Sequence, residues 1–148
     1  MRNWAITIVL LLAIGLSAWG QKGADAEQCS PQIDPDVALP HCTAAINSGR
    51  LSTSSLALTY MGRGVNYIRK GDYDRAIQDF DEVIRLNPKS SGAFTNRGVS
   101  YLQKGDYERA IQDFDKAIQL NPKNKVVFGA RGSLFYYRQG DYERDSGL

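Results

Sequence analysis

The sequence predicts an all-α protein, a solenoid of about two and a half helix–turn–helix repeats. The main observation is a phrase that occurs twice, from Arg63 to Pro88 and from Arg97 to Pro122, with matched residues 34 positions apart. A fixed period of this length is the signature of a repeat array. The second observation is that apolar residues within each copy recur at spacings of three and four, which is the period of one helical face.

The bulk composition is that of a single folded domain with a mixed surface charge. The chain has 148 residues, and 18 Lys or Arg nearly balance 16 Asp or Glu. Acidic and basic residues are interleaved, which is typical of a solvated helical surface. We expect no nucleic-acid partner, because the sequence contains no basic face or stripe.

Residues 1–26 have the features of a secretory signal peptide. Arg2 supplies a positive charge, Ala5 to Leu16 is almost entirely apolar, and small residues offer cleavage after position 20 or 26. The apolar run is shorter than the roughly 20 residues that span a bilayer. These features predict a periplasmic or secreted protein. The alternative is an uncleaved signal that anchors the protein in the inner membrane.

Two cysteines, Cys29 and Cys42, follow in an arm and short helix that we assign to residues 27–56. Disulfides persist in oxidising compartments, so an even pair after a signal peptide favours a Cys29–Cys42 bond. In the chain-entropy model, closing a loop of about 15 residues contributes roughly 3 kcal/mol. Two free thiols are the alternative. A metal site is disfavoured, because His41 is the only His and three ligands do not complete a tetrahedral site.

Pro and Gly residues mark the helix boundaries of the arm. We expect an extended or looping segment from Gln28 and a helix that Pro40 opens, because Pro suits the first turn of a helix. This helix is expected to run to about Asn47 and to end at Ser48-Gly49, with Gly as a left-handed terminator. It would act as half a repeat that covers the first full repeat.

The two full repeats are assigned to residues 57–90 and 91–124, each with a helix A and a helix B. In the first, Ser52 to Ser55 supply N-caps for a helix A that runs to about Lys70, and Asp72 caps helix B. Asn87-Pro88 closes helix B, because a residue before Pro is pushed out of the helical region. The residues expected to hold each repeat together are Gly64, Tyr67, Ala76, Phe80 and Pro88, and then Gly98, Tyr101, Ala110, Phe114 and Pro122.

This pattern resembles the tetratricopeptide repeat, a helix–turn–helix unit of the same length. The resemblance rests on those ten residues together with an early aromatic (Tyr60, Phe94, Phe128), and it covers Ala57 to the C-terminus. The arm resembles that of small bacterial secreted repeat proteins with a Cys-containing N-terminal arm. The resemblance implies a non-enzymatic module that binds a protein or peptide on the concave surface formed by helices A.

One departure from the family is an Arg before each helix-A Gly, where Leu is usual: Arg63, Arg97 and Arg131. Asp79, Asp81, Asp113 and Asp115 recur with the same period. We expect the arginines to pair with these aspartates within or between repeats. The alternative is a ladder of arginines that binds an acidic ligand.

The third copy, residues 125–148, is truncated after Arg144 and lacks a helix B. Its apolar and aromatic residues either fold on themselves as an imperfect cap or form an apolar contact site for a partner or a second copy of the chain. The alternative is a fraying tail. A self-assembling structural protein is therefore our second hypothesis for the function.

The resemblance also implies which residues line the groove. In the first repeat they are Leu58, Met61, Val65, Ile68 and Arg69. In the second they are Thr95, Val99, Leu102 and Gln103, and in the third Val126, Ser133, Tyr136 and Tyr137. This surface is mostly apolar and suits an extended or helical peptide with apolar anchors. Of the residue types in the family's clamp for C-terminal carboxylates, only Asn96 matches.

The sequence offers no set of residues for catalysis. A single His provides no Ser–His–acid set, and no phosphate loop or metal constellation is present. The pairs Arg75 with Asp79 and Arg109 with Asp113 lie four residues apart, so we expect them to interact on one helix face. We predict no enzyme activity, no cofactor and no small-molecule substrate.

Overall fold

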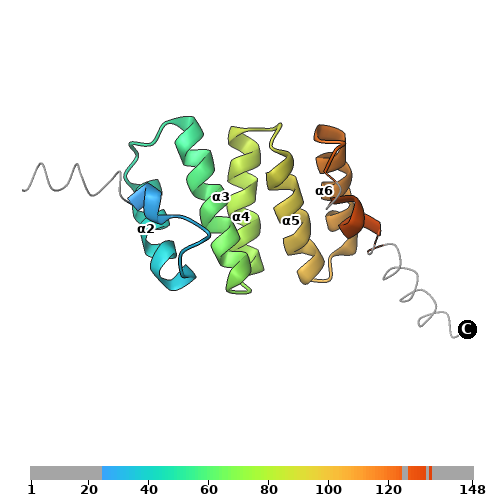
Figure 1. Ribbon diagram of the computed structural model, residues 1–148, viewed down its shortest axis with the longest axis horizontal. Helices are drawn as coiled ribbons and strands as arrows, with labels where there is room; N and C mark the ends of the chain where they lie inside the picture. The colour runs from blue at the N-terminus through green and yellow to red at the C-terminus, as the bar shows by residue number, and fades with distance from the viewer. Residues whose placement is uncertain (1–24, 125–126, 133, 135–148) are drawn as a thin grey trace, which may run out of the picture.

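The computed structural model describes residues 25–124, 127–132 and 134. The described part is helical, and its helices stand side by side in chain order (Figure 1). They are α2 (Pro35–Asn47), α3 (Thr53–Arg69), α4 (Tyr73–Leu86), α5 (Ser91–Gln103) and α6 (Tyr107–Leu120). Helices α3 and α4 form one repeat, and α5 and α6 form the next. The predicted all-α architecture is confirmed, whereas the predicted signal peptide lies almost entirely outside the described residues.

The helix boundaries follow from caps and glycines at equivalent places. Ser52 and Ser90 accept a hydrogen bond from a backbone N–H in the first turn of α3 and α5, and Asp72 and Asp106 do the same for α4 and α6. Gly49, Gly71 and Gly105 have φ between 63° and 77°, a conformation that residues with a side chain rarely adopt. The predicted boundaries at Ser52, Asp72 and Asn87 are confirmed.

The prediction that Pro40 opens the first helix was wrong. Helix α2 begins at Pro35, where Asp34 caps it by accepting from the backbone N–H of Asp36, and Pro40 lies inside the helix. A Pro at the first helical position needs no N–H partner, so Pro35 is the better start. Cys42, Ala38 and Ala45 are buried on one face, which packs against α3.

The core is a stack of aromatic rings against glycines. Phe80 and Phe114 are fully buried, and a Cβ at Gly64 or Gly98 would lie 2.7 or 2.8 Å from the ring of the following helix. Tyr67 and Tyr101 are buried beside them. The glycines are therefore needed where each helix A meets a Phe of helix B, and Ala76 and Ala110 are buried without any exposure.

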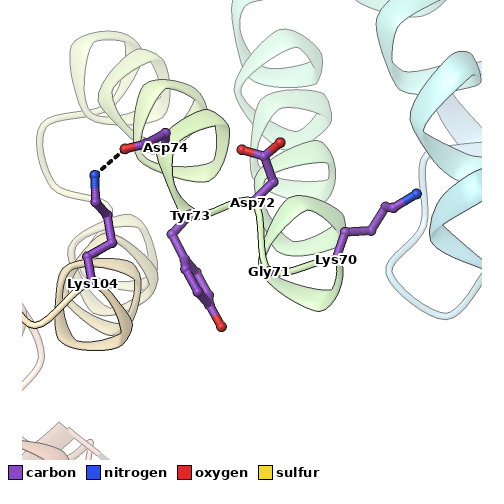
Figure 2. A pocket seen from close by; sticks show the side chains of 6 residues that line it. All are labelled: Lys70, Gly71, Asp72, Tyr73, Asp74 and Lys104. Carbon is purple, nitrogen blue, oxygen red and sulfur yellow. Dashed lines mark hydrogen bonds and ion pairs between the residues drawn. The ribbon is translucent and has the colours of Figure 1, made fainter.

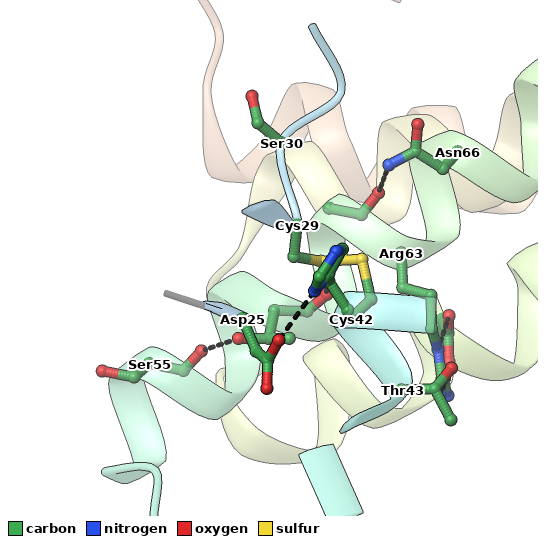
Figure 3. The surroundings of a disulfide bond; sticks show 12 residues. Asp25, Cys29, Ser30, Cys42, Thr43, Ser55, Arg63 and Asn66 are labelled. Carbon is green, nitrogen blue, oxygen red and sulfur yellow. Dashed lines mark hydrogen bonds and ion pairs between the residues drawn. A yellow bond between two sulfur atoms is a disulfide. The ribbon is translucent and has the colours of Figure 1, made fainter. Parts of the chain in front are cut away.

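The N-terminal arm is bonded to α2 by a disulfide and contacts α3 at Gly62 and Arg69. Cys29 and Cys42 are bonded, as expected from the sequence, with their Cα atoms 4.7 Å apart (Figure 3). The carbonyl oxygen of Cys29 lies 2.5 Å from the position that a Cβ of Gly62 would occupy. His41 Nδ1 and Asp25 Oδ1 are 2.7 Å apart at the start of the arm. The arm and α2 together cover the first repeat, as a half-repeat should.

Candidate functional site: the helix-A groove

The described residues of the predicted groove lie on α3 and α5. Six are half-buried, as expected of a lining: Met61, Val65, Ile68, Thr95, Val99 and Leu102. Arg69 and Gln103 are exposed at the ends of α3 and α5. Val126, Ser133, Tyr136 and Tyr137 lie outside the described residues.

An apolar hollow opens at the N-terminal end of α3. Its volume is about 410 Å³, and its apolar walls are Ala57, Leu58, Met61, Val83 and Leu86. Leu58 is 73% exposed, more than the exposed Val37 and Phe128 elsewhere in the described part of the chain. Uncharged polar residues complete the lining: Thr53, Ser54, Asn87 and Ser90. The hollow therefore suits an uncharged, bulky side chain of a ligand, whose neighbouring polar groups can contact the polar lining residues.

The residues of the second repeat that correspond to Leu58 and Met61 are smaller. One period after Leu58 and Met61 stand Gly92 and Thr95. Helix α3 also begins at Thr53, four residues before the position that corresponds to the start of α5 at Ser91. The family resemblance implied Leu58 and Met61 as groove residues, but the hollow is also lined by Val83, Leu86 and Asn87 at the end of α4, which the resemblance did not indicate.

Asn96 is the polar residue that faces this region from α5. Its side-chain Nδ2 lies 3.6 Å from the sulfur of Met61, a weak acceptor. A ligand carbonyl would be a better acceptor for this amide. Asn96 can therefore provide a polar contact beside an apolar anchor.

One nitrogen of the Arg69 guanidinium is hydrogen-bonded to the arm. Its Nη1 donates to the carbonyl oxygens of Pro31 at 2.8 Å and Ile33 at 2.6 Å, and to Oδ1 of Asn66 at 2.9 Å. Asn66 is fully buried and in turn donates to the carbonyl of Gly62 (Figure 3). Arg69 thus borders both the groove and the arm, a position that the spacing of groove residues could not show.

The arginines that precede the helix-A glycines form the expected ion pairs. Arg63 holds Asp79 through two hydrogen bonds of 2.7 and 2.9 Å, and Arg97 holds Asp113 in the same way at 2.7 and 2.8 Å. Arg97 also pairs with Asp81 of the preceding repeat, and Arg131 with Asp115. Arg63 reaches Thr43 of α2 instead of a second acid. These contacts give the arginines a structural role and leave the acidic-ligand alternative without support.

The electrostatics of these pairs follow from burial and hydrogen bonding. Hydrogen bonds to Asp79 and to Asp113 raise the pKa values of Arg63 and Arg97. Burial raises the pKa of the Asp79 carboxyl, and the Arg63 guanidinium opposes this. Because two N–H groups of Arg63 donate to its oxygens, we take Asp79 to be ionised at neutral pH.

The predicted pairs of Arg75 with Asp79 and Arg109 with Asp113 were wrong. Arg75 pairs with Asp72 and Arg109 with Asp106, three residues earlier, because Asp79 and Asp113 are taken by the arginines of helix A. The guanidinium carbon of Arg75 lies 4.7 Å from the ring centre of Tyr67, a distance typical of cation–π contacts.

A second hollow, of about 330 Å³, lies where the turns between helices A and B follow one another (Figure 2). Lys104 crosses it and pairs with Asp74 of the preceding repeat, and Lys70 pairs with Asp36 in the same way. Its charged groups compensate one another across the junction of two repeats. We assign it a role in stacking.

Two kinds of site are not found among the residues that the structure describes. No cluster of His, Cys, Asp or Glu there could hold a metal ion. No helix within residues 25–124 has both the length and the apolar character required to span a bilayer.

The model of the tetratricopeptide repeat family matches residues 61–125. The chain carries tetratricopeptide repeats. YrrB, a tetratricopeptide repeat protein with an unusual peptide-binding site, is similar in structure with a TM-score of 0.59 and 28% identity. The match covers 66% of this chain and 48% of YrrB, so the chain spans about half of that protein.

A second solved structure supports the fold of these tetratricopeptide repeats. It is the first tetratricopeptide repeat domain of Spaghetti (RPAP3), bound to the HSP90 peptide SRMEEVD. The TM-score is 0.69, and the match covers 82% of this chain and 93% of that one, but the identity is 18%. No curated protein matches the sequence. The family predicted from the sequence is confirmed, and solved structures of this fold include peptide-binding proteins.

Proposed function

We propose that this protein is a non-enzymatic module of the periplasm or the secreted space that binds a segment of another protein in its helix-A groove. The observation that carries the proposal is the hollow between α3, α4 and the turn before α5, where Leu58 is exposed beside Met61. An exposed apolar residue at the rim of a hollow favours recognition of an apolar side chain. The peptide-binding structures similar to this chain support the same class of function.

The compartment is part of the proposal. The signal-like residues 1–26 and the disulfide between Cys29 and Cys42 both favour an oxidising compartment. Mass spectrometry of the protein purified from its host checks the location. We expect a mature N-terminus after residue 20 or 26, and an intact N-terminus in the membrane fraction would instead indicate an anchor.

Site-specific photo-crosslinking in the native compartment tests the groove. The crosslinker replaces Leu58, and the matched control replaces Gln78, an exposed residue of α4. We expect a discrete adduct with another protein from position 58 and none from position 78. Adducts of the chain only with itself would support self-assembly, and no adduct from position 58 would count against groove recognition.

A further inference from the structure

Arg69 lacks the acidic partner that other arginines of the described chain have. Ion pairs with Asp or Glu are formed by Arg63, Arg75, Arg85, Arg97, Arg109 and Arg131. Arg69 donates instead to two backbone carbonyls and one amide oxygen, all through Nη1. Within the described residues its Nε and Nη2 have no hydrogen-bond partner, so its positive charge is not compensated by a direct contact.

Two carboxylates, Asp34 and Asp36, follow Ile33 in the chain and are engaged at the start of α2. Asp34 accepts from the backbone N–H of Asp36, and Asp36 pairs with Lys70. Neither forms an ion pair with Arg69 in the part of the chain that the structure describes. The guanidinium therefore remains available to an acidic group from outside.

Helix geometry places Arg69 in line with the apolar hollow. Leu58, Val65 and Arg69 are separated by seven and four residues, so they lie on one face of α3. With a rise of 1.5 Å per residue, Leu58 and Arg69 are roughly 16 Å apart along the helix. The arm contacts α3 at Gly62 and at Arg69 itself, so a ligand on the Leu58 face would run beside the arm.

We propose that this groove binds an extended segment of a partner protein that carries one bulky aliphatic side chain and one acidic side chain. The aliphatic side chain enters the hollow beside Leu58 and Met61, and the carboxylate accepts from Nε and Nη2 of Arg69. An extended chain advances about 3.3 Å per residue and its side chains alternate between two sides, so the two ligand residues are about four or six positions apart. This inference rests on the proposed function and specifies its ligand.

The arm prepares Arg69 for this contact. Three acceptors on Nη1 hold the guanidinium in place, which reduces the side-chain entropy lost when a carboxylate binds. The equivalent residue of the second repeat is Gln103, which carries no charge. The groove thus has one apolar site and one cationic site, both on α3, and they fix the direction in which a ligand lies.

Selection from a displayed peptide library tests the inference on the full-length, disulfide-bonded protein. Random peptides of about twelve residues exceed the required span, and they are fused through their C-termini so that no free terminal carboxylate is present. We expect enriched peptides with a Leu, Ile or Met and an Asp or Glu about four or six residues away. Enriched apolar peptides without an acidic residue would overturn the inference and leave the proposed function standing. No enrichment at all would contradict both.

Variants at Arg69 then identify the contact. For a selected peptide we expect Arg69→Gln to weaken binding about tenfold, the scale of a hydrogen bond to a charged group, and to remove the preference for Glu over Gln in the peptide. Arg69→Lys should lose less, and Arg85→Gln, on α4 and paired with Glu82, should bind as the wild type does. An unchanged preference for Glu in Arg69→Gln would overturn the assignment. A preference of Arg69 for a peptide's free C-terminus over its amide would overturn the choice of an acidic side chain.

Discussion

Equivalent faces of α3 and α5 are covered by very different neighbours. On α5 the face that carries Asn96 packs toward α3, where its neighbour is the flexible side chain of Met61. On α3 the same face carries Gly62 and is covered by the backbone of the arm at Cys29. The backbone of the arm lies so close to α3 that the first repeat needs a Gly where the second has Asn.

The first and second repeats also differ in their ion pairs. Arg97 has an acid in its own repeat and another in the preceding one, whereas Arg63 has Asp79 and the hydroxyl of Thr43. The first repeat therefore depends on a single carboxylate and a disulfide. The second has two carboxylates paired with Arg97.

The largest difference in stability between the first and second repeats is expected when the buried Asp partner of the helix-A arginine is removed. We expect Asp79→Ala to cost about 4 kcal/mol in the free energy of unfolding, because Arg63 is left partly buried without a carboxylate. Asp113→Ala should cost about 2 kcal/mol, because Arg97 keeps Asp81. Urea denaturation measures both, with the half-exposed Asp81→Ala as a control that should lose less than about 1 kcal/mol. Equal losses for Asp79→Ala and Asp113→Ala would show that the second acid contributes nothing.

Loss of the disulfide should affect the arm, α2 and α3 most. We expect the double variant Cys29→Ser and Cys42→Ser to lose about 3 kcal/mol, the value for a loop of this length. Hydrogen exchange should accelerate in α2 and α3 more than in α5 and α6, because each repeat is stabilised by its neighbours alone. Uniform acceleration along the chain would mean that the array unfolds as one unit.

Gly62 offers a smaller and more local test of the close contact with the arm. We expect Gly62→Ala to cost about 1–3 kcal/mol, because the new Cβ must displace the carbonyl of Cys29. The matched control is Gly92→Ala on α5, where the Cβ would meet only Met61 Cε, at 3.9 Å. Its stability should stay unchanged or rise by up to about 1 kcal/mol. A thermal melt of both variants decides the matter, and a tolerated Gly62→Ala would mean that the arm moves freely.

The smallest expected effect concerns the Asp caps of α4 and α6, which behave alike in the two repeats. Hydrogen bonds from Arg75 and Arg109 lower the pKa values of Asp72 and Asp106 below the ordinary value of 3.8. The two ionised carboxylates contribute to the free energy of unfolding above the ordinary pKa. This contribution is lost as the pH falls through the lowered pKa values of the folded state. Circular dichroism during acid titration should show a later loss of helix in the wild type than in Asp72→Asn with Asp106→Asn. Identical acid transitions would contradict a role for these charges.

Most of the fold followed from the sequence because the determinants are local and repeat. The glycines that face Phe80 and Phe114, the Asp72 cap and the Asn87-Pro88 boundary could all be read from spacing. The start of α2 was predicted wrongly because both Pro35 and Pro40 suit a first turn, and only the Asp34 cap distinguishes them. The partners of Arg75 and Arg109 were missed because Asp79 and Asp113 are taken by residues 16 positions away in the sequence.

The site was predictable only in part. The family resemblance implied Met61, Val65 and Leu102 as groove residues, and they are half-buried on α3 and α5. The hollow at Leu58 depends on the end of α4, and the setting of Arg69 depends on the carbonyls of Pro31 and Ile33. Contacts to backbone atoms of a distant segment leave no pattern in side-chain spacing.

The pairing of Arg97 with one acid in its own repeat and another one period earlier bears on how such a chain can lengthen. A duplicated block of 34 residues, inserted between the two repeats, would bring one arginine and both acids with it. Both new junctions would then find every partner already in place. The first repeat cannot be duplicated in this way, because Arg63 contacts Thr43 of α2 instead of a second acid. Helix α2, which covers this repeat, is bonded to the arm by a disulfide. Growth by duplication is thus open in the interior of the array and closed at its first end.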